Sequence, residues 1–272
     1  MNFCLQGVRK HYVVDHEIVA ALNGISLSLP KGEVLAVLGS SGAGKTTLFR
    51  LLNATMRPSS GSLRLDGREL GTMSSGELRR TRRKIGTIYQ KHNLVPSLTA
   101  LENTLSGCLG RWSLAQTIRS VLRPAKADVQ EAIYALEQVE LADKRNARAD
   151  ELSGGQQQRV AIARVLMQKP EVILADEPVA SLDPALTEEI MSLLLRVGSE
   201  GQRTLVVAIH KVELALEFFP RVIGLQRGSL YFDCSATRVD SQLLDGLYAG
   251  VRKKVERIQD DDEFQDRFGC AR

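Results

Sequence analysis

Aromatic residues and cysteines are scarce in this sequence. Phe, Trp and Tyr together make up 5% of the 272 residues, and only one Trp occurs. The four cysteines lie far apart, and no two of them form a C-x-x-C pair. This spacing argues against a disulfide framework and against a zinc site, so we expect reduced thiols. The cysteines are Cys4, Cys108, Cys234 and Cys270.

Long apolar segments are also lacking. No stretch approaches the roughly 18 apolar residues that a membrane-spanning helix needs, and the first residues contain no continuous apolar segment of signal-peptide type. The net charge of +4 is too small to indicate nucleic acid as a partner. We therefore expect a protein of the cytosol, which reaches a membrane only through a partner.

The chain does have enough apolar residues for a full core. Hydrophobic residues make up 43% of the sequence. At this length, one large α/β domain with a helical subdomain is the simplest partition.

The central motif is GSSGAGKT, which matches the phosphate-binding pattern G-x-x-x-x-G-K-[ST] at every fixed position. The short apolar segment Val34–Leu38 before it predicts a buried parallel strand, and Thr46–Asn53 after it predicts a helix. Strand, glycine loop and helix are the context that this motif requires. The residues expected to contact the nucleotide here are Gly39, Ser40, Ser41, Gly42, Ala43, Gly44, Lys45, Thr46 and Thr47.

The residue types of this loop explain its chemistry. Glycines let backbone N–H groups turn inward around an anion, and the following helix points its positive end at the phosphates. We expect Lys45 to reach the β- and γ-phosphates of ATP and the Thr46 hydroxyl to ligate Mg²⁺.

Two acids end the apolar strand predicted over Val172–Glu177. We expect Asp176 to hold Mg²⁺ and Glu177 to polarise the attacking water. A further buried strand is predicted over Thr204–Ile209, and His210 follows it at the same sheet edge, where it could contact a γ-phosphate.

Gln90 ends another predicted strand, Ile85–Gln90. Its amide could touch Mg²⁺ or the attacking water, although a capped surface glutamine is the alternative. Tyr12 lies between two predicted antiparallel strands, Phe3–Val8 and Ile25–Leu29. Its ring could stack on adenine, with an ordinary half-exposed tyrosine as the alternative.

A second phosphate-binding end is predicted at Leu152–Arg159 (LSGGQQQR). Ser153, Gly154 and Gly155 can open the helix predicted over Gln156–Met167 and leave backbone donors exposed. One chain has one triphosphate loop, so a second such end suggests a second chain. A plain capped helix is the alternative.

The remaining segments suggest organisation rather than chemistry. Helical periodicity dominates Lys91–Asp150, which predicts an inserted helical subdomain. We interpret the basic stretch Glu77–Lys84 as a solvated helix face, because no aromatic residues interleave its arginines. A hairpin is predicted through Arg227-Gly228, and a charged tail follows at 251–272.

The order of these parts resembles the ATP-binding cassette (ABC) family over about residues 2–250. Gly39–Thr46 resembles Walker A and Val172–Glu177 resembles Walker B with its catalytic glutamate. Leu152–Gln156 (LSGGQ) resembles the family signature and is highly specific beside a phosphate loop. Four further elements match in position: Gln90 the Q-loop, Ser181-Leu182-Asp183 the D-loop, His210 the switch histidine, and Tyr12 the adenine-stacking aromatic.

A finer resemblance is to the ATP-binding subunits of phosphonate importers. The stretches that carry it are Ile85–Gln90, Asn93–Val95, Arg148–Arg159 and Ile173–Pro184. Two features depart from that pattern: Lys211 follows His210 where Gln is expected, and the tail beyond Gly250 is longer.

The resemblance implies a P-loop ATPase fold with a parallel sheet, an N-terminal antiparallel β subdomain and a helical subdomain at about 91–150. It implies that two copies bind two ATP molecules head to tail, each site taking Ser153, Gly154, Gly155 and Gln156 from the other copy. It also implies membrane permease subunits, which would place the protein on the cytoplasmic face of the membrane, and indirectly an external substrate-binding protein. Nucleic acid is not among the implied partners.

Other ATPases with the same motifs are the main alternatives. The ATPase of a lipoprotein-release or macrolide-type exporter would share every ATPase motif. A soluble cassette protein acting on ribosomes or DNA is a remoter alternative, because this chain has one cassette and no long heptad run.

Overall fold

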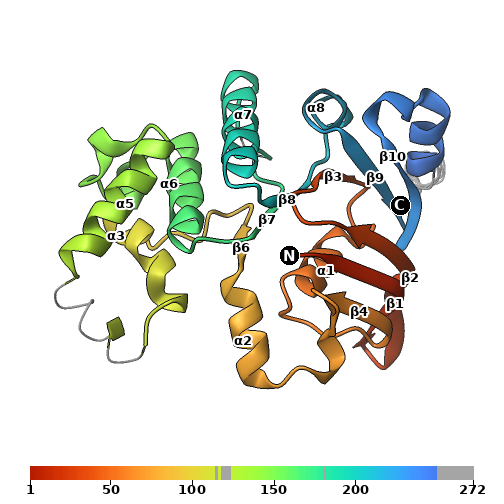
Figure 1. The fold of residues 1–272 in the computed structure, drawn as a ribbon. Helices are drawn as coiled ribbons and strands as arrows, with labels where there is room; N and C mark the ends of the chain where they lie inside the picture. Colours follow the sequence, from red (N-terminus) through yellow and green to blue (C-terminus); the bar gives the residue numbers. More distant parts are fainter. Residues whose placement is uncertain (114–115, 118–123, 181, 250–272) are drawn as a thin grey trace, which may run out of the picture.

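A computed structural model describes residues 1–113, 116–117, 124–180 and 182–249. Strands and helices alternate along most of this part of the chain (Figure 1). The strands are β1 (Phe3–Val14), β2 (Glu17–Leu29), β3 (Val34–Leu38), β4 (Ser60–Leu65), β5 (Arg68–Glu69), β6 (Ile85–Ile88), β7 (Val172–Asp176), β8 (Thr204–Ala208), β9 (Arg221–Gln226) and β10 (Ser229–Ser235). The helices are α1 (Lys45–Leu52), α2 (Ser75–Arg83), α3 (Ala100–Leu105), α5 (Lys126–Gln138), α6 (Gly154–Met167), α7 (Pro184–Glu200) and α8 (Val212–Phe218).

The N-terminal strands form an antiparallel sheet in the order β2-β1-β4-β5. This confirms the predicted antiparallel subdomain, but β1 and β2 are longer than the alternating segments suggested. The pairing continues through the opposed residues Val13 and Ile18, both largely exposed. β-Branched side chains favour extended backbone even where nothing covers them.

A second sheet carries the order β10-β9-β3-β8-β7-β6. Five of its strands are parallel, and β10 joins antiparallel at the edge through the predicted hairpin at Arg227-Gly228. The carboxyl ends of β3, β8, β7 and β6 therefore meet at one edge of the sheet. Ligand sites of parallel sheets lie at this edge.

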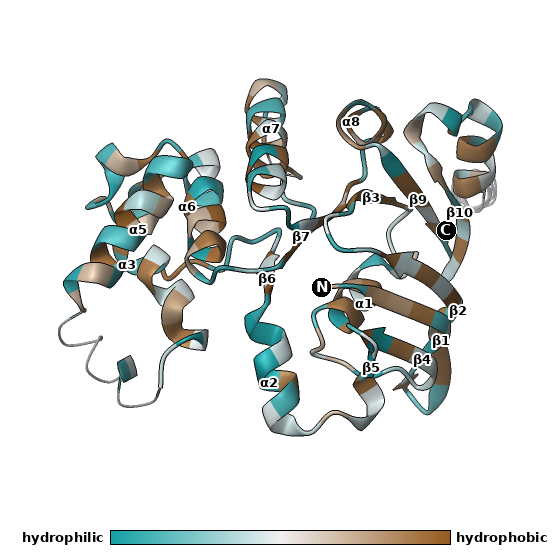
Figure 2. Cartoon of the chain, viewed as in Figure 1, coloured by the Kyte–Doolittle hydropathy of each residue, from teal (hydrophilic) through white to brown (hydrophobic). Residues whose placement is uncertain are grey.

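The core fills both faces of the parallel sheet. Along β3, Leu35 and Val37 pack in the apolar cluster shared with α1 and the antiparallel sheet, whereas Ala36 and Leu38 pack toward α7 and α8. Burial on both faces explains why this strand is apolar throughout. In Figure 2, β3 and β9 are brown while α2 is mostly teal, and Leu78 is its one buried residue. The exposure of most α2 side chains thus confirms the prediction of a solvated helix face.

Helices α3, α5 and α6 form a separate group, on the left of Figure 1. Helix α6 packs against both α3 and α5, and it also contacts β6 and α7. The helical group predicted over Lys91–Asp150 therefore continues into α6, which connects it to the parallel sheet. Ser181 and the predicted tail at 251–272 lie outside the described residues, as does part of the segment after Trp112.

Strand β6 is shorter than predicted. It ends at Ile88, and Gln90 lies in a turn in which the His92 N–H donates to the Tyr89 carbonyl at 3.0 Å. β6 is an edge strand paired only with β7, and the pairing ends at Ile88 opposite Ala175. Beyond that point no neighbouring strand keeps the backbone extended.

No helix in the described part of the chain has the length and apolar character needed to cross a membrane. Cys4, Cys108 and Cys234 are free thiols.

Candidate nucleotide-binding site

The loop between β3 and α1 presents backbone N–H groups rather than side chains. Gly44 caps α1 with φ 107° and no side-chain cap bond, so the first N–H groups of the helix remain available to an anion. A Cβ at Gly44 would lie 2.8 Å from the Ala21 carbonyl oxygen. This position therefore needs glycine for both its backbone angle and its space.

The same loop is braced by the turn between β9 and β10. The Gly228 N–H donates to the Ala43 carbonyl at 2.9 Å, and the Asn23 N–H donates to the Gly228 carbonyl at 2.7 Å. The Asn23 side chain also donates to the Arg227 carbonyl. The sequence predicted this turn but gave no sign that it touches the phosphate loop, because the contact joins segments far apart in the chain.

Lys45 is buried beneath the loop, with 5% of its surface exposed. Its ammonium donates to the carbonyl oxygens of Gly39 at 2.7 Å and Ser40 at 3.2 Å, and lies 3.9 Å from a Glu177 carboxylate oxygen. Burial lowers the pKa of Lys45, and the nearby Glu177 and Asp176 offset part of that effect. The amine is thus a desolvated cation held beside the loop.

Asp176 ends β7 opposite the first turn of α1. Its carboxylate accepts a hydrogen bond from the Thr46 hydroxyl at 3.4 Å. Burial raises the pKa of Asp176, and the neighbouring Glu177 carboxylate adds to the rise. A hydroxyl and a carboxylate are the oxygen ligands that Mg²⁺ prefers, and no cluster of three acidic, His or Cys side chains is found among the described residues. This pair fits a magnesium ion that takes its other ligands from phosphate and water.

Glu177 follows Asp176 with a left-handed backbone, φ 54°. Its N–H donates to the Ala208 carbonyl, which fixes the residue to the end of β8. Its carboxylate lies 2.5 Å from His210 Nε2. A non-glycine residue with φ above zero costs energy and is held only by strong surrounding contacts. The structure thus places Glu177 between the two predicted site residues Lys45 and His210.

Tyr12 and Gln90, for each of which the sequence left an alternative role, also have defined positions. The Tyr12 hydroxyl lies 3.4 Å from the Thr47 hydroxyl and donates to the Met56 sulfur, so its ring stands beside the start of α1. Gln90 is exposed in its turn, beyond the end of β6 and at the same sheet edge as Asp176.

The LSGGQ segment begins α6 as predicted. Ser153 caps the helix and accepts from the Gln156 N–H, while the Gln156 side chain accepts from the Ser153 N–H. A Cβ at Gly155 would lie 2.3 Å from the Leu186 side chain of α7, so the helix start is tightly packed. Figure 1 places α6 in the helical group, apart from α1. The two predicted phosphate-binding ends therefore do not meet within one chain.

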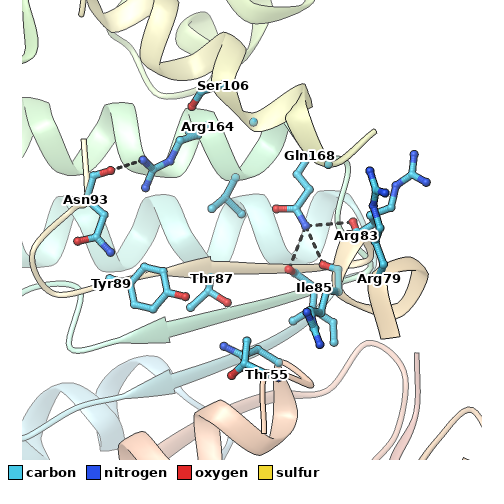
Figure 3. A pocket seen from close by; sticks show the side chains of 15 residues that line it. Thr55, Arg79, Arg83, Ile85, Thr87, Tyr89, Asn93, Ser106, Arg164 and Gln168 are labelled. Atoms are coloured by element: carbon cyan, nitrogen blue, oxygen red, sulfur yellow. Dashed lines mark hydrogen bonds between the residues drawn. The ribbon is translucent and has the colours of Figure 1, made fainter. Parts of the chain in front are cut away.

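A basic groove of about 500 Å³ lies where the helical group, β6 and α2 meet (Figure 3). Arg164 points across it to donate to the Asn93 carbonyl, and Gln168 donates to the carbonyls of Arg83 and Ile85. The sequence did not single out these side chains. The basic side chains that line the groove are Arg79, Arg82, Arg83 and Arg164.

Known proteins resemble this chain over most of its length. The profile of the family described as ABC transporter matches residues 22–180. A phosphonates import ATP-binding protein PhnC from Pseudomonas fluorescens (strain Pf0-1) is 44% identical over 231 residues, covering 85% of this chain and 86% of that protein. A PhnC 1 protein from Rhodopseudomonas palustris (strain BisB18) is 46% identical, covering 84% of each chain.

Among solved structures, the ATP-binding cassette MJ0796, a dimer in a post-hydrolysis state bound to ADP and Pi, superimposes with a TM-score of 0.75. It is 34% identical to this chain, and the match covers 86% of this chain and 98% of MJ0796.

Proposed function

Since this chain belongs to the ABC transporter family, we propose that it is the ATP-hydrolysing subunit of an importer for phosphonates or a related phosphorus oxyanion. The observation that carries the ATPase part is the meeting of a buried lysine, two acids and a histidine at one sheet edge. They are Lys45, Asp176, Glu177 and His210.

The phosphate loop and Lys45 bind the triphosphate. Lys45 now donates to carbonyl oxygens of its own loop, and phosphate oxygens are stronger acceptors for a desolvated ammonium. The uncapped N–H groups of α1 face the same anion. Tyr12 offers its ring to adenine beside Thr47.

Glu177 and His210 act on the attacking water. Water attacks the γ-phosphorus as the bond to the β–γ bridging oxygen breaks, which yields ADP and phosphate. Glu177 orients this water and accepts its proton, while His210 holds the carboxylate and reaches toward the γ-phosphate. Gln90 lies at the same edge, where its amide would contact the metal or the water. Thr46 and Asp176 would hold magnesium, which would supply positive charge beside the β- and γ-phosphate oxygens.

Two copies of the chain complete each site. The LSGGQ end of α6 begins with the exposed residues Ser153 and Gly154 but lies apart from the phosphate loop of its own chain. In a head-to-tail dimer, Ser153, Gly154, Gly155 and Gln156 of one copy face the γ-phosphate bound to the other. ATP then closes the dimer, and hydrolysis opens it. The dimeric state of MJ0796 supports this arrangement.

The partners follow from the import function. Membrane permease subunits dock on the groove between the helical group and the sheet, whose arginines favour an acidic segment. The protein then lies at the cytoplasmic face of the membrane, and a substrate-binding protein delivers the oxyanion from outside. The names of the relatives favour this function over the ATPase of an exporter.

The experiment measures the uptake of a labelled phosphonate by the source cell after deletion of this gene. The strain is complemented with the wild type or with Glu177→Gln, both expressed to the same level. We expect the deletion to abolish uptake, and the wild type alone to restore it.

Unchanged uptake in the deletion strain, with an active ATPase in purified form, would reject the phosphonate assignment. Phosphite and phosphate uptake would then be measured in the same strains. Full restoration by Glu177→Gln would reject Glu177 as the hydrolytic residue.

A further inference from the structure

The ring of Tyr12 carries a cation on one face. The ammonium nitrogen of Lys10 lies over the ring, 5.8 Å from its centroid. We propose that Lys10 is a positioning residue for the nucleobase: it covers one face of the Tyr12 ring, leaves the other face to adenine and strengthens the stacking there. The inference deepens the proposed function and rests on the stacking role that this function gives to Tyr12.

The end of β1 that carries both side chains extends beyond the wider part of its sheet. β1 pairs with β4 only as far as Arg9, which lies opposite Ser60. From Lys10 onward, β2 is its one partner among the described strands. The residue opposite Tyr12 on β2 is Val19, which is itself 48% exposed. The ring therefore depends on side-chain contacts for its position.

These contacts come from α1 and the segment that follows it. The Tyr12 hydroxyl donates to the Met56 sulfur at 3.2 Å and lies 3.4 Å from the Thr47 hydroxyl. Lys10 Nζ donates to the Arg57 carbonyl at 3.1 Å. Since Met56 and Arg57 are consecutive, one short segment holds both the hydroxyl of the ring and the cation over its face.

A cation in this place affects stacking in two ways. Its attraction to the negative face of the ring keeps the ring in one orientation, so less conformational freedom is lost when a base binds. The cation also draws π-electron density toward its own face, so the opposite face repels the π electrons of a stacked purine less. The second effect needs the charge of Lys10, which a neutral hydrogen-bond donor does not supply.

Two simpler roles for Lys10 make different predictions. If Lys10 only braces the loop through the Arg57 carbonyl, any donor of similar length at this position should suffice. If its charge attracts the triphosphate directly, loss of the charge should weaken the binding of a triphosphate that has no base. The proposed role predicts that the charge is needed, and only for a ligand with a base.

The test measures dissociation constants by isothermal titration calorimetry without Mg²⁺, for ATP and for inorganic tripolyphosphate. Lys10→Gln keeps a donor and removes the charge, whereas Lys10→Arg keeps both. We expect Lys10→Gln to raise the Kd of ATP about threefold, the scale of an exposed cation–π contact, and to leave the Kd of tripolyphosphate within about 1.5-fold. Lys10→Arg should bind ATP like the wild type.

Two controls show whether Lys10 acts through the ring. Arg9→Gln makes the same charge change at the exposed neighbouring residue and should leave both dissociation constants within about 1.5-fold. In a Tyr12→Leu background, Lys10→Gln should have no further effect on ATP binding, because the ring through which it acts is gone. Thermal unfolding checks each variant, and Lys10→Met replaces Lys10→Gln if the latter unfolds at the titration temperature.

Wild-type ATP affinity in Lys10→Gln, or an equal weakening for ATP and tripolyphosphate, would overturn the role of Lys10. So would a loss of ATP affinity that persists in the Tyr12→Leu background. Wild-type ATP affinity in Tyr12→Leu alone would instead overturn the stacking function on which the inference rests.

Discussion

At the scale of single residues, charged side chains are buried at the sheet edge where β3 and β7 end. Asp176 and Glu177 are neighbours, and Lys45 is the cation beside them. Burial opposes the ionised form of both Asp176 and Lys45. Burial of these charges is therefore electrostatically costly, and in the function proposed above a bound triphosphate with its metal would offset part of that cost.

The first prediction concerns the pH dependence of this cost. The pKa of Asp176 is raised in the folded protein, so folding favours its protonated form. That contribution is present below the unfolded pKa of about 4 and is lost as pH rises through the folded pKa. Asparagine stays neutral, so Asp176→Asn should melt above the wild type at pH 7 to 8, and the difference should shrink toward about pH 4.

Differential scanning calorimetry without nucleotide measures this effect, and Asp143→Asn, an exposed position, is the control. A lower melting temperature for Asp176→Asn across the whole range would contradict the raised pKa.

The sequence could predict which residues lie at this sheet edge, but not the burial and backbone strain that they have there. Lys45, Asp176 and Glu177 follow from short motifs and from the strands before them. The left-handed backbone of Glu177 and the burial of Lys45 do not, because both depend on segments that the motifs do not contain.

At the scale of elements, the contact between α6 and α7 limits what the LSGGQ segment can accommodate. Gly155 lies against Leu186, and an added Cβ would come within 2.3 Å of its side chain. We predict that Gly155→Ala lowers the free energy of unfolding by about 1–3 kcal/mol, the usual cost of overpacking.

Leu186→Ala in the same chain should recover much of this loss, which urea denaturation and a double-mutant cycle would measure. Gly154→Ala is the matched control, because its Cβ would meet only Leu182 at the ordinary distance of 3.8 Å. Additive effects of Gly155→Ala and Leu186→Ala would refute the packing argument.

Elements with local signals could be predicted, and those set by distant partners could not. The apolar segment Val34–Leu38, the Ser153 cap and the hairpin at Arg227-Gly228 all occur as expected. The end of β6 was placed too late because the pairing with β7, not the local sequence, sets it. The bond between His92 and Gln158 has no local signal, since it joins the turn after β6 to helix α6, far apart in the sequence.

At the scale of the whole molecule, the basic groove lies where the helical group, β6 and α2 meet. Arg82, Arg83 and Arg164 each donate to carbonyl oxygens of the chain. Arg79 is exposed, and none of the described residues pairs with it. It is therefore the arginine of the groove most available to a partner.

We predict that Arg79→Glu reduces phosphonate uptake at least about fivefold, because reversal of one charge at a complementary contact costs roughly 1 kcal/mol or more. Uptake in the complemented deletion strain is the measurement, and thermal unfolding checks the fold. Arg238→Glu makes the same charge change at an exposed position outside the groove and should leave uptake unchanged. Equal uptake for both variants would remove the groove from the docking surface.

The brace on the phosphate loop has a consequence for biosynthesis. The loop is made early, yet Ala43 accepts from Gly228, and β3 pairs with β8 and β9, all of which emerge from the ribosome much later. Non-local pairings of this kind form only after the distant segment exists. A nascent chain that stops before Thr204 would carry every residue of the loop and lack β8, β9 and the Gly228 turn that support it. We therefore expect nucleotide binding only after β8, β9 and the Gly228 turn have been translated, so ATP would stabilise only chains that extend past Gly228.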